Sequence, residues 1–560
     1  MSAPAKTVGP LDSAPLRSAP SRFRPRFAPL AEALLAALAA AMLYAGLYGE
    51  LPHHDVARFV AQINSGRFVW DIGHIFLQPA TLVWHTHLGF GETAEASQKH
   101  INTFATAAGI GIFYALLQWL GVSAWQRVLA TVVVACSFSL IVLAPSGHMK
   151  LLAFPFVNAS LFMLVRWEAR RGMPSGPGLG GCLFAGAVLL ALAASFLASA
   201  LATAPFATLA ILATRLRNRD GWLKALVSSG FFAVVCGVTF VLLVCIGYTL
   251  FAGSAPSLHG LAGSVADKAE LRPPTYNVVA SMARLVFTSV NNLIYAPDTG
   301  PVLRAWISGQ VPSLAPYARV LVLQALPSLL TLALLLATYL LAVRAVVSGV
   351  ACLVPVAFLC GALAWSAYYD LNDPEHRFLA TVPTVILFLL LVPPRIGRLV
   401  LPCWAVMTAA INVFIYAVPY ATYPLKTYEA QLRRTFTSND LLIGFAAYSG
   451  GPSVAFLDLP GVPQLRLDTR LDESADLNAF YAGVDRDIAA ALARHGRVVV
   501  LGNVLDPYDW NAPWVDLPAR GVRKQQLIEF FTGHYKVEPA GSIAGLKAWE
   551  ILPADSGPAR

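Results

Sequence analysis

The sequence predicts a polytopic α-helical membrane protein of about eleven transmembrane helices, with a soluble α/β domain at its C-terminal end. The first supporting observation is composition: 57% of the 560 residues are hydrophobic and 13% are charged, against about 25% charged residues in soluble domains. The second is a mean hydropathy of +0.61. The third is that 16 of the 31 acidic residues follow position 420. An apolar membrane part therefore precedes a polar C-terminal part.

The apolar part divides into runs that are long enough to cross a membrane. About 30 Å of hydrocarbon requires roughly 20 helical residues, and the backbone polar groups of such a run must be bonded within the helix. The stretch 179–214 contains 36 residues without a charge and is interrupted by small residues and Pro205. It predicts two short helices, with one long tilted helix as the alternative. The predicted spans are 29–48, 102–121, 127–145, 150–165, 179–196, 198–214, 223–251, 317–343, 346–367, 377–393 and 399–419.

Basic residues near the span ends predict the orientation. If the N-terminus is cytoplasmic, sixteen Lys and Arg residues fall in cytoplasmic segments against few acidic ones, which is the bias typical of that side. With eleven spans, the C-terminal domain then lies outside the cytoplasm. The sixteen residues are Lys6, Arg17, Arg22, Arg24, Arg26, Arg127, Arg166, Arg170, Arg171, Arg215, Arg217, Arg219, Lys224, Arg344, Arg395 and Arg398.

This orientation defines the expected domains of an integral plasma (inner) membrane protein. Residues 1–28, rich in Ser, Pro and Ala, are expected to form a disordered basic cytoplasmic tail that meets lipid head groups rather than nucleic acid, and no cleavable signal peptide is expected. Residues 29–423 form the expected transmembrane domain, and residues 424–560 the extracytoplasmic α/β domain. The expected outer loops are 49–100, 252–316 and 368–376.

Polar residues gather in the first outer loop. His54 and Asp55 follow the first span, and Asp71 and His74 follow among apolar residues of a predicted interfacial helix over 72–90. Ionisable groups near the hydrocarbon are costly, so this cluster is a hypothesis for a functional site. The alternative for Asp55 is that it caps a helix over 56–64, because Asp is a preferred N-cap residue.

The sequence predicts no cofactor with certainty. The first loop contains six histidines, but their spacing fits no known metal site, and His85 and His87 would diverge on a helix. The seven cysteines lie in or at the ends of apolar runs and form no CxxC pattern, so disulfides are not expected. A divalent cation held by Asp55 and another acid is left open.

The third outer loop is short and very polar. It leads through Asp373, Glu375 and His376 into Arg377, the first residue of a predicted span. An Arg at this position could bind a phosphate through two parallel hydrogen bonds. The alternative is that Arg377 extends toward the head groups or pairs with Asp373 or Glu375.

These two constellations, in this order and on this topology, resemble the GT-C superfamily of membrane glycosyltransferases. That family has an acidic residue just after the first transmembrane helix, which matches Asp55, although Val56 stands where a second acid is frequent. It also tends to carry an Arg followed by an aromatic residue at the start of a late span, which matches Arg377 and Phe378. The architectural match covers roughly residues 29–420. The oligosaccharyltransferase signature Trp-Trp-Asp is absent from the C-terminal domain.

The resemblance implies a polyprenyl-phosphate-linked sugar as donor and a glycan, lipid or protein acceptor on the outer side of the membrane. Asp55 is then the general base that deprotonates the acceptor hydroxyl, and the anomeric carbon is inverted. Arg377 and His376 are implied to bind the phosphate of the donor. The residues implied to contact the substrate are His54, Asp71, His74 and Glu375.

The C-terminal part alternates strand and helix patterns. Strands are predicted over 453–457, 497–501, 535–539 and 546–552, and helices over 485–494 and 524–532. No GxGxxG, P-loop or GxSxG pattern occurs there. Asp506, Asp509, Trp510 and Trp514 form a polar and aromatic loop for which sugar binding and ordinary packing are both open.

Two other functional classes compete with the glycosyltransferase. A transporter or flippase should show internal repeats and charges at mid-depth, whereas here the acidic residues cluster at the outer face. A non-catalytic scaffold for envelope assembly should tolerate substitution of Asp55, which separates it from an enzyme.

Overall fold

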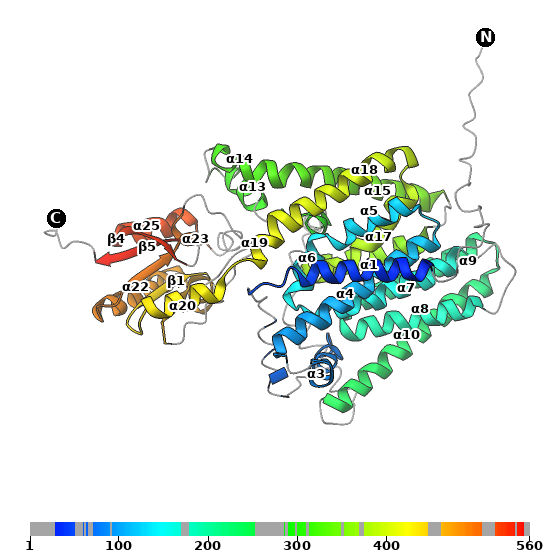
Figure 1. The fold of residues 1–560 in the computed structure, drawn as a ribbon, viewed down its shortest axis with the longest axis horizontal. Helices are drawn as coiled ribbons and strands as arrows, with labels where there is room; N and C mark the ends of the chain where they lie inside the picture. Colours follow the sequence, from blue (N-terminus) through cyan, green and yellow to red (C-terminus); the bar gives the residue numbers. More distant parts are fainter. Residues whose placement is uncertain are drawn as a thin grey trace, which may run out of the picture.

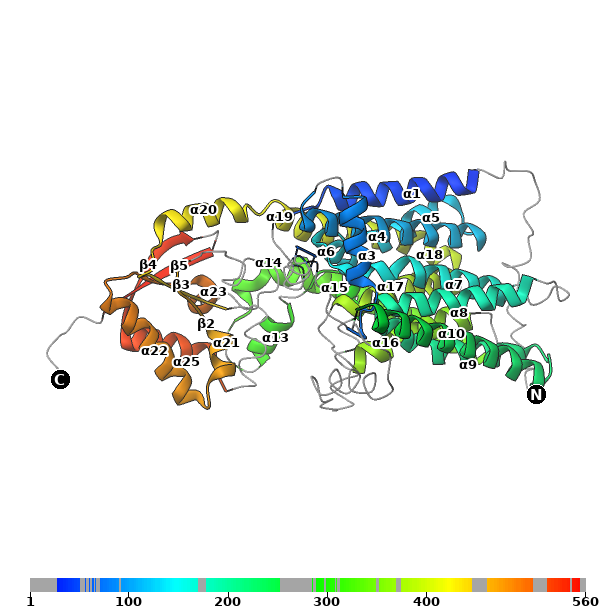
Figure 2. The same cartoon turned by 90° about the horizontal axis from the view of Figure 1, so that it is seen from below.

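In the computed structural model the chain forms a helical bundle with an α/β domain at one end, and the two parts lie end to end (Figures 1 and 2). The C-terminal domain follows directly from the last helix of the bundle (Figure 2). The structure describes residues 28–50, 56, 60, 63–64, 66, 71–89, 92–169, 178–251, 285, 289–296, 299–307, 309, 313–348, 352–368, 374–445, 461–506, 521–543 and 546–553.

The bundle confirms the class of helical membrane protein. Among the described residues, seven helices are long and apolar enough to cross a membrane, or eight if one bent pair counts as a single span. Three further predicted spans correspond to the shorter apolar helices α8, α16 and α17. The helices are α1 (Ala28–Ala45), α4 (Ala94–Trp119), α5 (Ala124–Ala135), α6 (Phe138–Ser146), η1 (Met149–Ala153), α7 (Phe154–Ala169), α8 (Gly178–Phe196), η3 (Ala198–Ala202), α9 (Thr203–Arg217), α10 (Trp222–Phe251), α14 (Ala318–Val320), η5 (Leu321–Ala325), α15 (Leu326–Val347), α16 (Leu353–Tyr368), α17 (Pro374–Leu391), α18 (Pro394–Ala409), η6 (Ala410–Ala417) and α19 (Val418–Ala421).

The uncharged stretch 179–214 forms two helices, as predicted, rather than one long helix. Helix α8 ends at Phe196, the 3-10 turn η3 follows, and α9 begins at Thr203. Pro205 falls in the first turn of α9, where its missing N–H costs no helical hydrogen bond. Because proline is tolerated in the first turn of a helix, the interruption between α8 and α9 comes before Pro205, and α9 runs through it.

The predicted span 127–145 differs from the expectation because it is bent. Helices α5 and α6 meet at an angle of 62° around Cys136 and Ser137. Such a break exposes backbone carbonyls that must find other donors inside the bundle. The hydroxyl of Tyr44 donates to the carbonyl of Ala135 at 2.9 Å, and the amide of Asn412 donates to that of Cys136 at 2.8 Å.

Asn412 joins three segments of the bundle. It lies in the π-helical segment η6 and is fully buried. Besides Cys136, its amide nitrogen donates to the carbonyl of Leu293 at 2.7 Å, and its oxygen accepts from the backbone N–H of Tyr295 at 2.8 Å. The side chain therefore ties the bend of α5 and α6 and the segment 289–296 to the last helix.

Carboxylates hold the end of the bundle that is far from the C-terminal domain. Glu168, buried at the end of α7, accepts from the backbone N–H groups of Leu353 and Val354 at 3.0 and 3.2 Å. These N–H groups belong to the first turn of α16, where a helix has free donors. Glu32 of α1 pairs with Arg127 of α5 at 2.7 Å. Arg127, one of the sixteen basic residues used for orientation, therefore has an acidic partner.

The C-terminal domain contains a five-stranded mixed sheet in the order β2-β1-β3-β5-β4. Strand β1 is parallel to β2 and β3, and β5 is antiparallel to β3 and β4. The elements are α20 (Leu425–Thr435), β1 (Leu441–Gly444), β2 (Gln464–Arg466), α21 (Leu467–Glu473), α22 (Leu477–Ala493), β3 (Val498–Leu501), α23 (Gly502–Leu505), α25 (Lys524–His534), β4 (Tyr535–Ile543) and β5 (Leu546–Pro553).

Most elements predicted for this domain are present. The helices expected over 485–494 and 524–532 correspond to α22 and α25, and three of the expected strands to β3, β4 and β5. The strand expected over 453–457 lies outside the described residues. Strands β1 and β2 were missed, because they are only four and three residues long. Of the predicted polar and aromatic loop, Asp506 is described and pairs with Lys547 of β5 at 2.7 Å.

Asp440 fixes the start of β1. Its carboxylate accepts from the backbone N–H of Thr437 and of Arg497, both at 2.6 Å, and from the Thr437 hydroxyl at 3.0 Å. Burial alone raises the pKa of Asp440, but these hydrogen bonds and the charge of Arg497 outweigh it, so the pKa lies below its usual value. The charged form therefore stabilises the junction of β1 and β3.

The core of the C-terminal domain also receives side chains from the segment between α10 and α14. Helix α13 (Thr299–Ile307) places Val302 in it, and Tyr317, just before α14, lies in the same cluster. Both are buried beside strand residues such as Ile443. The domain is therefore packed onto the bundle and is not only tethered to it.

Candidate functional site

The candidate site is at the end of the bundle that faces the C-terminal domain (Figure 2). Two of the predicted residues, His54 and Asp55, lie outside the described residues. Helix α17 begins at Pro374, so Glu375 and His376 belong to its first turn, although their side chains are not among those described. The other three predicted residues, Asp71, His74 and Arg377, are described.

Arg377 is buried at the start of a membrane helix. Its exposed fraction is 6%, and it lies in the first turn of α17. The next residue, Phe378, is fully buried and packs edge-to-face on Phe154 at 5.8 Å between ring centroids. Burying a guanidinium is costly unless charged or polar groups compensate it. Arg377 interacts with other groups of the protein at this buried helix start.

Asp71 and His74 form a tight turn between α1 and α3. A carboxylate oxygen of Asp71 accepts from the backbone N–H of Gly73 at 2.7 Å. The Nδ1 atom of His74 lies 3.1 Å from the carbonyl oxygen of Phe196, the last residue of α8. Their polar atoms therefore take part in holding the backbone.

Backbone hydrogen bonds tie the same turn to the break between α8 and α9. The N–H of Phe76 donates to the carbonyl of Ser195 at 3.1 Å, and the N–H of Ala198 donates to the carbonyl of Gly73 at 3.0 Å. The break thus provides the free backbone groups that a continuous helix would lack. The division of 179–214 into two helices is what anchors the turn before α3 here.

The interfacial helix predicted over 72–90 is α3 (Leu77–His87). Leu77 packs with Ile101, Met149 and Leu152, so the helix rests on α4 and η1. Phe378 packs on Phe154, which follows η1 directly. The helix that follows the turn of Asp71 and the start of α17 thus contact the two ends of η1. As a 3-10 helix with a rise of about 2 Å per residue, η1 is about 10 Å long.

The structure adds buried basic residues that the sequence analysis did not single out. Lys150 lies on η1 with an exposed fraction of 7%, and His148 just before it is fully buried. Lys99 of α4 is 8% exposed, and its amine donates to the carbonyl of Gly49 at 2.9 Å and to Glu95 at 2.6 Å. The available signal was the position of His148 in the very short connection 146–149 between two predicted spans, and of Lys150 at the start of the second of them.

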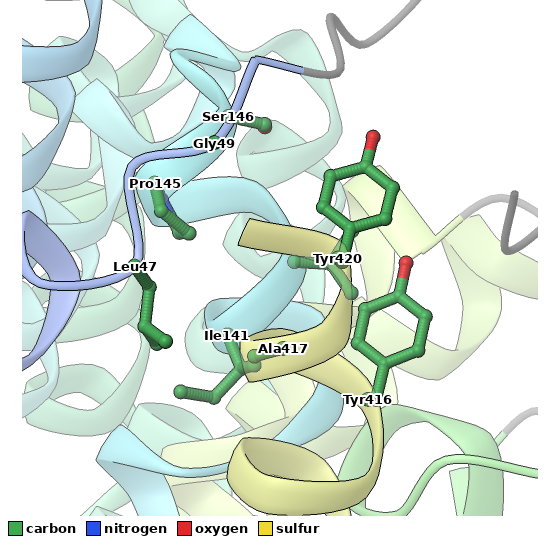
Figure 3. Close-up of a pocket in the computed structure, with 9 residues that line it drawn as sticks. Leu47, Gly49, Ile141, Pro145, Ser146, Tyr416, Ala417 and Tyr420 are labelled. Carbon is green, nitrogen blue, oxygen red and sulfur yellow. The ribbon is translucent and has the colours of Figure 1, made fainter. Parts of the chain in front are cut away.

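A shallow pocket opens at this end of the bundle (Figure 3). Tyr416 and Tyr420 project from the last helix with nearly parallel rings, 5.7 Å between centroids. Tyr416 also contacts the ring of Tyr295 at 4.5 Å. The pocket is lined by Leu47, Gly49, Ile141, Val142, Pro145, Ser146, Tyr416, Ala417 and Tyr420.

Among the described residues, no group of three or more His, Cys, Asp or Glu side chains could hold a metal ion. Asp55 lies outside that part of the chain. The cation that Asp55 and a second acid were predicted to hold therefore stays a prediction.

Comparison with known proteins gives similarity of fold only. No family model matches the chain, and no curated protein sequence matches it. Among solved structures, ArnT from Cupriavidus metallidurans bound to undecaprenyl phosphate is 12% identical, with a TM-score of 0.44, over 95% of this chain and 100% of that one. The oligosaccharyltransferase from Archaeoglobus fulgidus, in complex with Zn and sulfate, is 13% identical, with a TM-score of 0.45, over 93% of this chain and 72% of that one. At these values the chain is similar to both in arrangement, and its function has to be argued from its own residues.

Proposed function

We propose that this protein is a membrane glycosyltransferase that moves a sugar from a polyprenyl-phosphate-linked donor to an extracytoplasmic acceptor. The observation that carries the proposal is the burial of Arg377 in the first turn of α17, next to Phe378, which packs on Phe154 directly after η1. A lipid-linked phosphosugar has its chain in the hydrocarbon and its phosphate at the interface. The donor therefore brings negative charge to the depth at which Arg377 lies.

The proposed reaction is a single displacement. Asp55 accepts the proton of an acceptor hydroxyl, the hydroxyl oxygen attacks the anomeric carbon, and the bond from that carbon to the phosphate oxygen breaks with inversion. Arg377 and His376 bind the phosphate as its negative charge increases. His54 and Glu375 contact the substrate. Asp71 and His74 shape the neighbouring turn, in keeping with their hydrogen bonds to Gly73 and Phe196.

Binding of undecaprenyl phosphate to detergent-purified variants tests the phosphate site. Arg377→Lys keeps the charge but loses the two-pronged geometry, and Arg377→Ala loses both. A charged hydrogen bond is worth roughly 1.5–3 kcal/mol, so we expect Arg377→Ala to weaken affinity about ten- to a hundredfold, with Arg377→Lys in between. Arg395→Ala is the matched control, because Arg395 is exposed in the first turn of α18, just beyond the opposite end of α17. Unchanged affinity per folded molecule in Arg377→Ala would remove the residue from the site.

Substitution of the base tests catalysis separately from binding. Asp55→Asn keeps the size and the capping ability of the side chain but cannot accept the proton. Loss of a positioned base typically costs 10²–10⁴-fold in rate. We expect that loss in sugar transfer with donor affinity unchanged. Full transfer activity in folded Asp55→Asn would contradict the assignment and favour a scaffold, and net lipid-linked sugar movement without transfer would favour a flippase.

A further inference from the structure

Gly49 and Glu50, which follow shortly after the end of α1 at Ala45, lie between the bundle and the C-terminal domain. We call them the wedge. On one side, the amine of Lys99 donates to the carbonyl of Gly49 at 2.9 Å, and the Tyr48 hydroxyl donates to the carbonyl of Lys99 at 3.2 Å. Lys99 is itself buried and paired with Glu95 at 2.6 Å. The start of α4 therefore holds the wedge firmly.

On its other side, the wedge contacts the chain where the bundle passes into the C-terminal domain. A Cβ atom added to Gly49 would lie 2.9 Å from the Cα atom of Ala421 and 3.2 Å from the carbonyl oxygen of Tyr420. The first distance is one that real Cβ atoms essentially never show, the second is tighter than most real Cβ contacts, and both neighbours are backbone atoms that cannot swing away. Only glycine allows this close approach of the chain after α1 to the end of α19.

Glu50 extends the same contact into the C-terminal domain. Its carboxylate accepts from the backbone N–H of Lys426 at 2.9 Å, in the first turn of α20. The preceding residue of the chain is Leu425, and Pro424 before it has no N–H to offer. A carboxylate at this place satisfies a free helical donor and interacts favourably with the positive end of the helix dipole.

We propose that Glu50 is a positioning residue, through which the C-terminal domain sets the geometry of the outer end of α1 for sugar transfer. The proposal rests on the proposed function for its catalytic consequence. Four contacts, from Lys99, Ala421, Tyr420 and Lys426, converge on two consecutive residues, five positions before Asp55 in the sequence. The same domain takes up Val302 from the second outer loop, so it connects both long outer loops to the bundle.

Hydrogen exchange of the full-length protein tests the contact itself. In Glu50→Ala, we expect the amides of α20 to exchange about 5- to 30-fold faster, because the helix start loses a charged acceptor. Glu50→Gln keeps an acceptor oxygen and should restore most of the protection. Glu538→Ala, at an exposed pair with Lys536 on β4, is the matched control and should leave α20 unchanged. Unchanged exchange in Glu50→Ala, or no rescue by Glu50→Gln, would overturn the proposal.

A steric variant tests the other half of the wedge. Gly49→Ala must push α19 and α20 away and should also speed exchange in α20, whereas Gly237→Ala, where nothing lies within 4 Å of the added atom, should not.

Kinetics then test the functional part: we expect kcat for transfer to fall about tenfold in Glu50→Ala, with affinity for undecaprenyl phosphate unchanged. A fall in donor affinity instead would overturn the positioning role. Absence of transfer in the unmodified protein would refute the proposed function, while the exchange results would still decide the contact.

Discussion

Three buried asparagines offer a graded test of how the bundle is held together. Asn412, Asn102 and Asn158 have exposed fractions of 0%, 0% and 2%. Substitution by Ala removes the same atoms in each case, so the lost volume is matched. The side chains differ in the backbone hydrogen bonds they make: three for Asn412, two for Asn102 and one for Asn158.

The number of backbone N–H and C=O groups that lose a hydrogen bond in each variant sets the expected order of stability. Each lost hydrogen bond costs about 1 kcal/mol in soluble proteins and averages about 0.6 kcal/mol between membrane helices. Asn412→Ala loses two more bonds than Asn158→Ala, so we expect it to be less stable by about 1–2 kcal/mol. Asn102→Ala should lie between them. The excess for Asn412 also reflects the bend of α5 and α6, since the carbonyl of Cys136 loses its donor there.

A thiol-reactive dye can follow unfolding in detergent, because Cys136 and Cys236 are buried and become reactive only when the bundle opens. The midpoints of thermal unfolding should fall in the order Asn158→Ala, Asn102→Ala, Asn412→Ala. Asn218→Ala, at the exposed end of α9, should match the unmodified protein. Equal midpoints for the Asn412 and Asn158 variants would refute the reasoning from hydrogen-bond number.

Three other predictions concern different parts of the chain. Glu168→Ala leaves two N–H groups of α16 without an acceptor and should cost about 2–4 kcal/mol of unfolding free energy, whereas Asp220→Ala, at a half-exposed pair, should cost under 1 kcal/mol. The pKa of Asp440 is lowered in the fold, so its stabilisation is present above the unfolded value of 3.8 and is lost as the pH falls through the folded value. The protection of the β1 and β3 amides, measured against their intrinsic exchange rate at each pH, should therefore fall at low pH, and Asp440→Asn should show reduced protection at neutral pH as well. A reporter enzyme active only outside the cytoplasm should work when fused after residue 430 and fail near 172 or 218, and reversed activities would overturn the orientation.

Much of the candidate site was recognisable from the sequence, but its architecture was not. Arg377 stood out because a charge opens an apolar run, and its burial in the first turn of α17 agrees with a specialised position. Asp71 and His74 stood out as polar residues among apolar ones, and Asp71 binds the nearby N–H of Gly73, yet the partner of His74 is the carbonyl of Phe196 at a helix break 122 residues away. Lys150 was overlooked because a single Lys at a span end is ordinary for a membrane protein.

The sequence by itself determined the class of the protein: long apolar runs require helices in a membrane, and the polar last quarter requires a separate α/β domain. Only the tertiary structure decided where the span 127–145 bends, because the donor that satisfies Cys136 is on Asn412, 276 residues further along the chain. It likewise decided that Glu50 holds α20 and that Val302 enters the core of the C-terminal domain. Hydrophobicity is a property of a segment and can be read locally. The partner of a buried polar atom is fixed by the packing of segments that are distant in the sequence, and no local pattern records it.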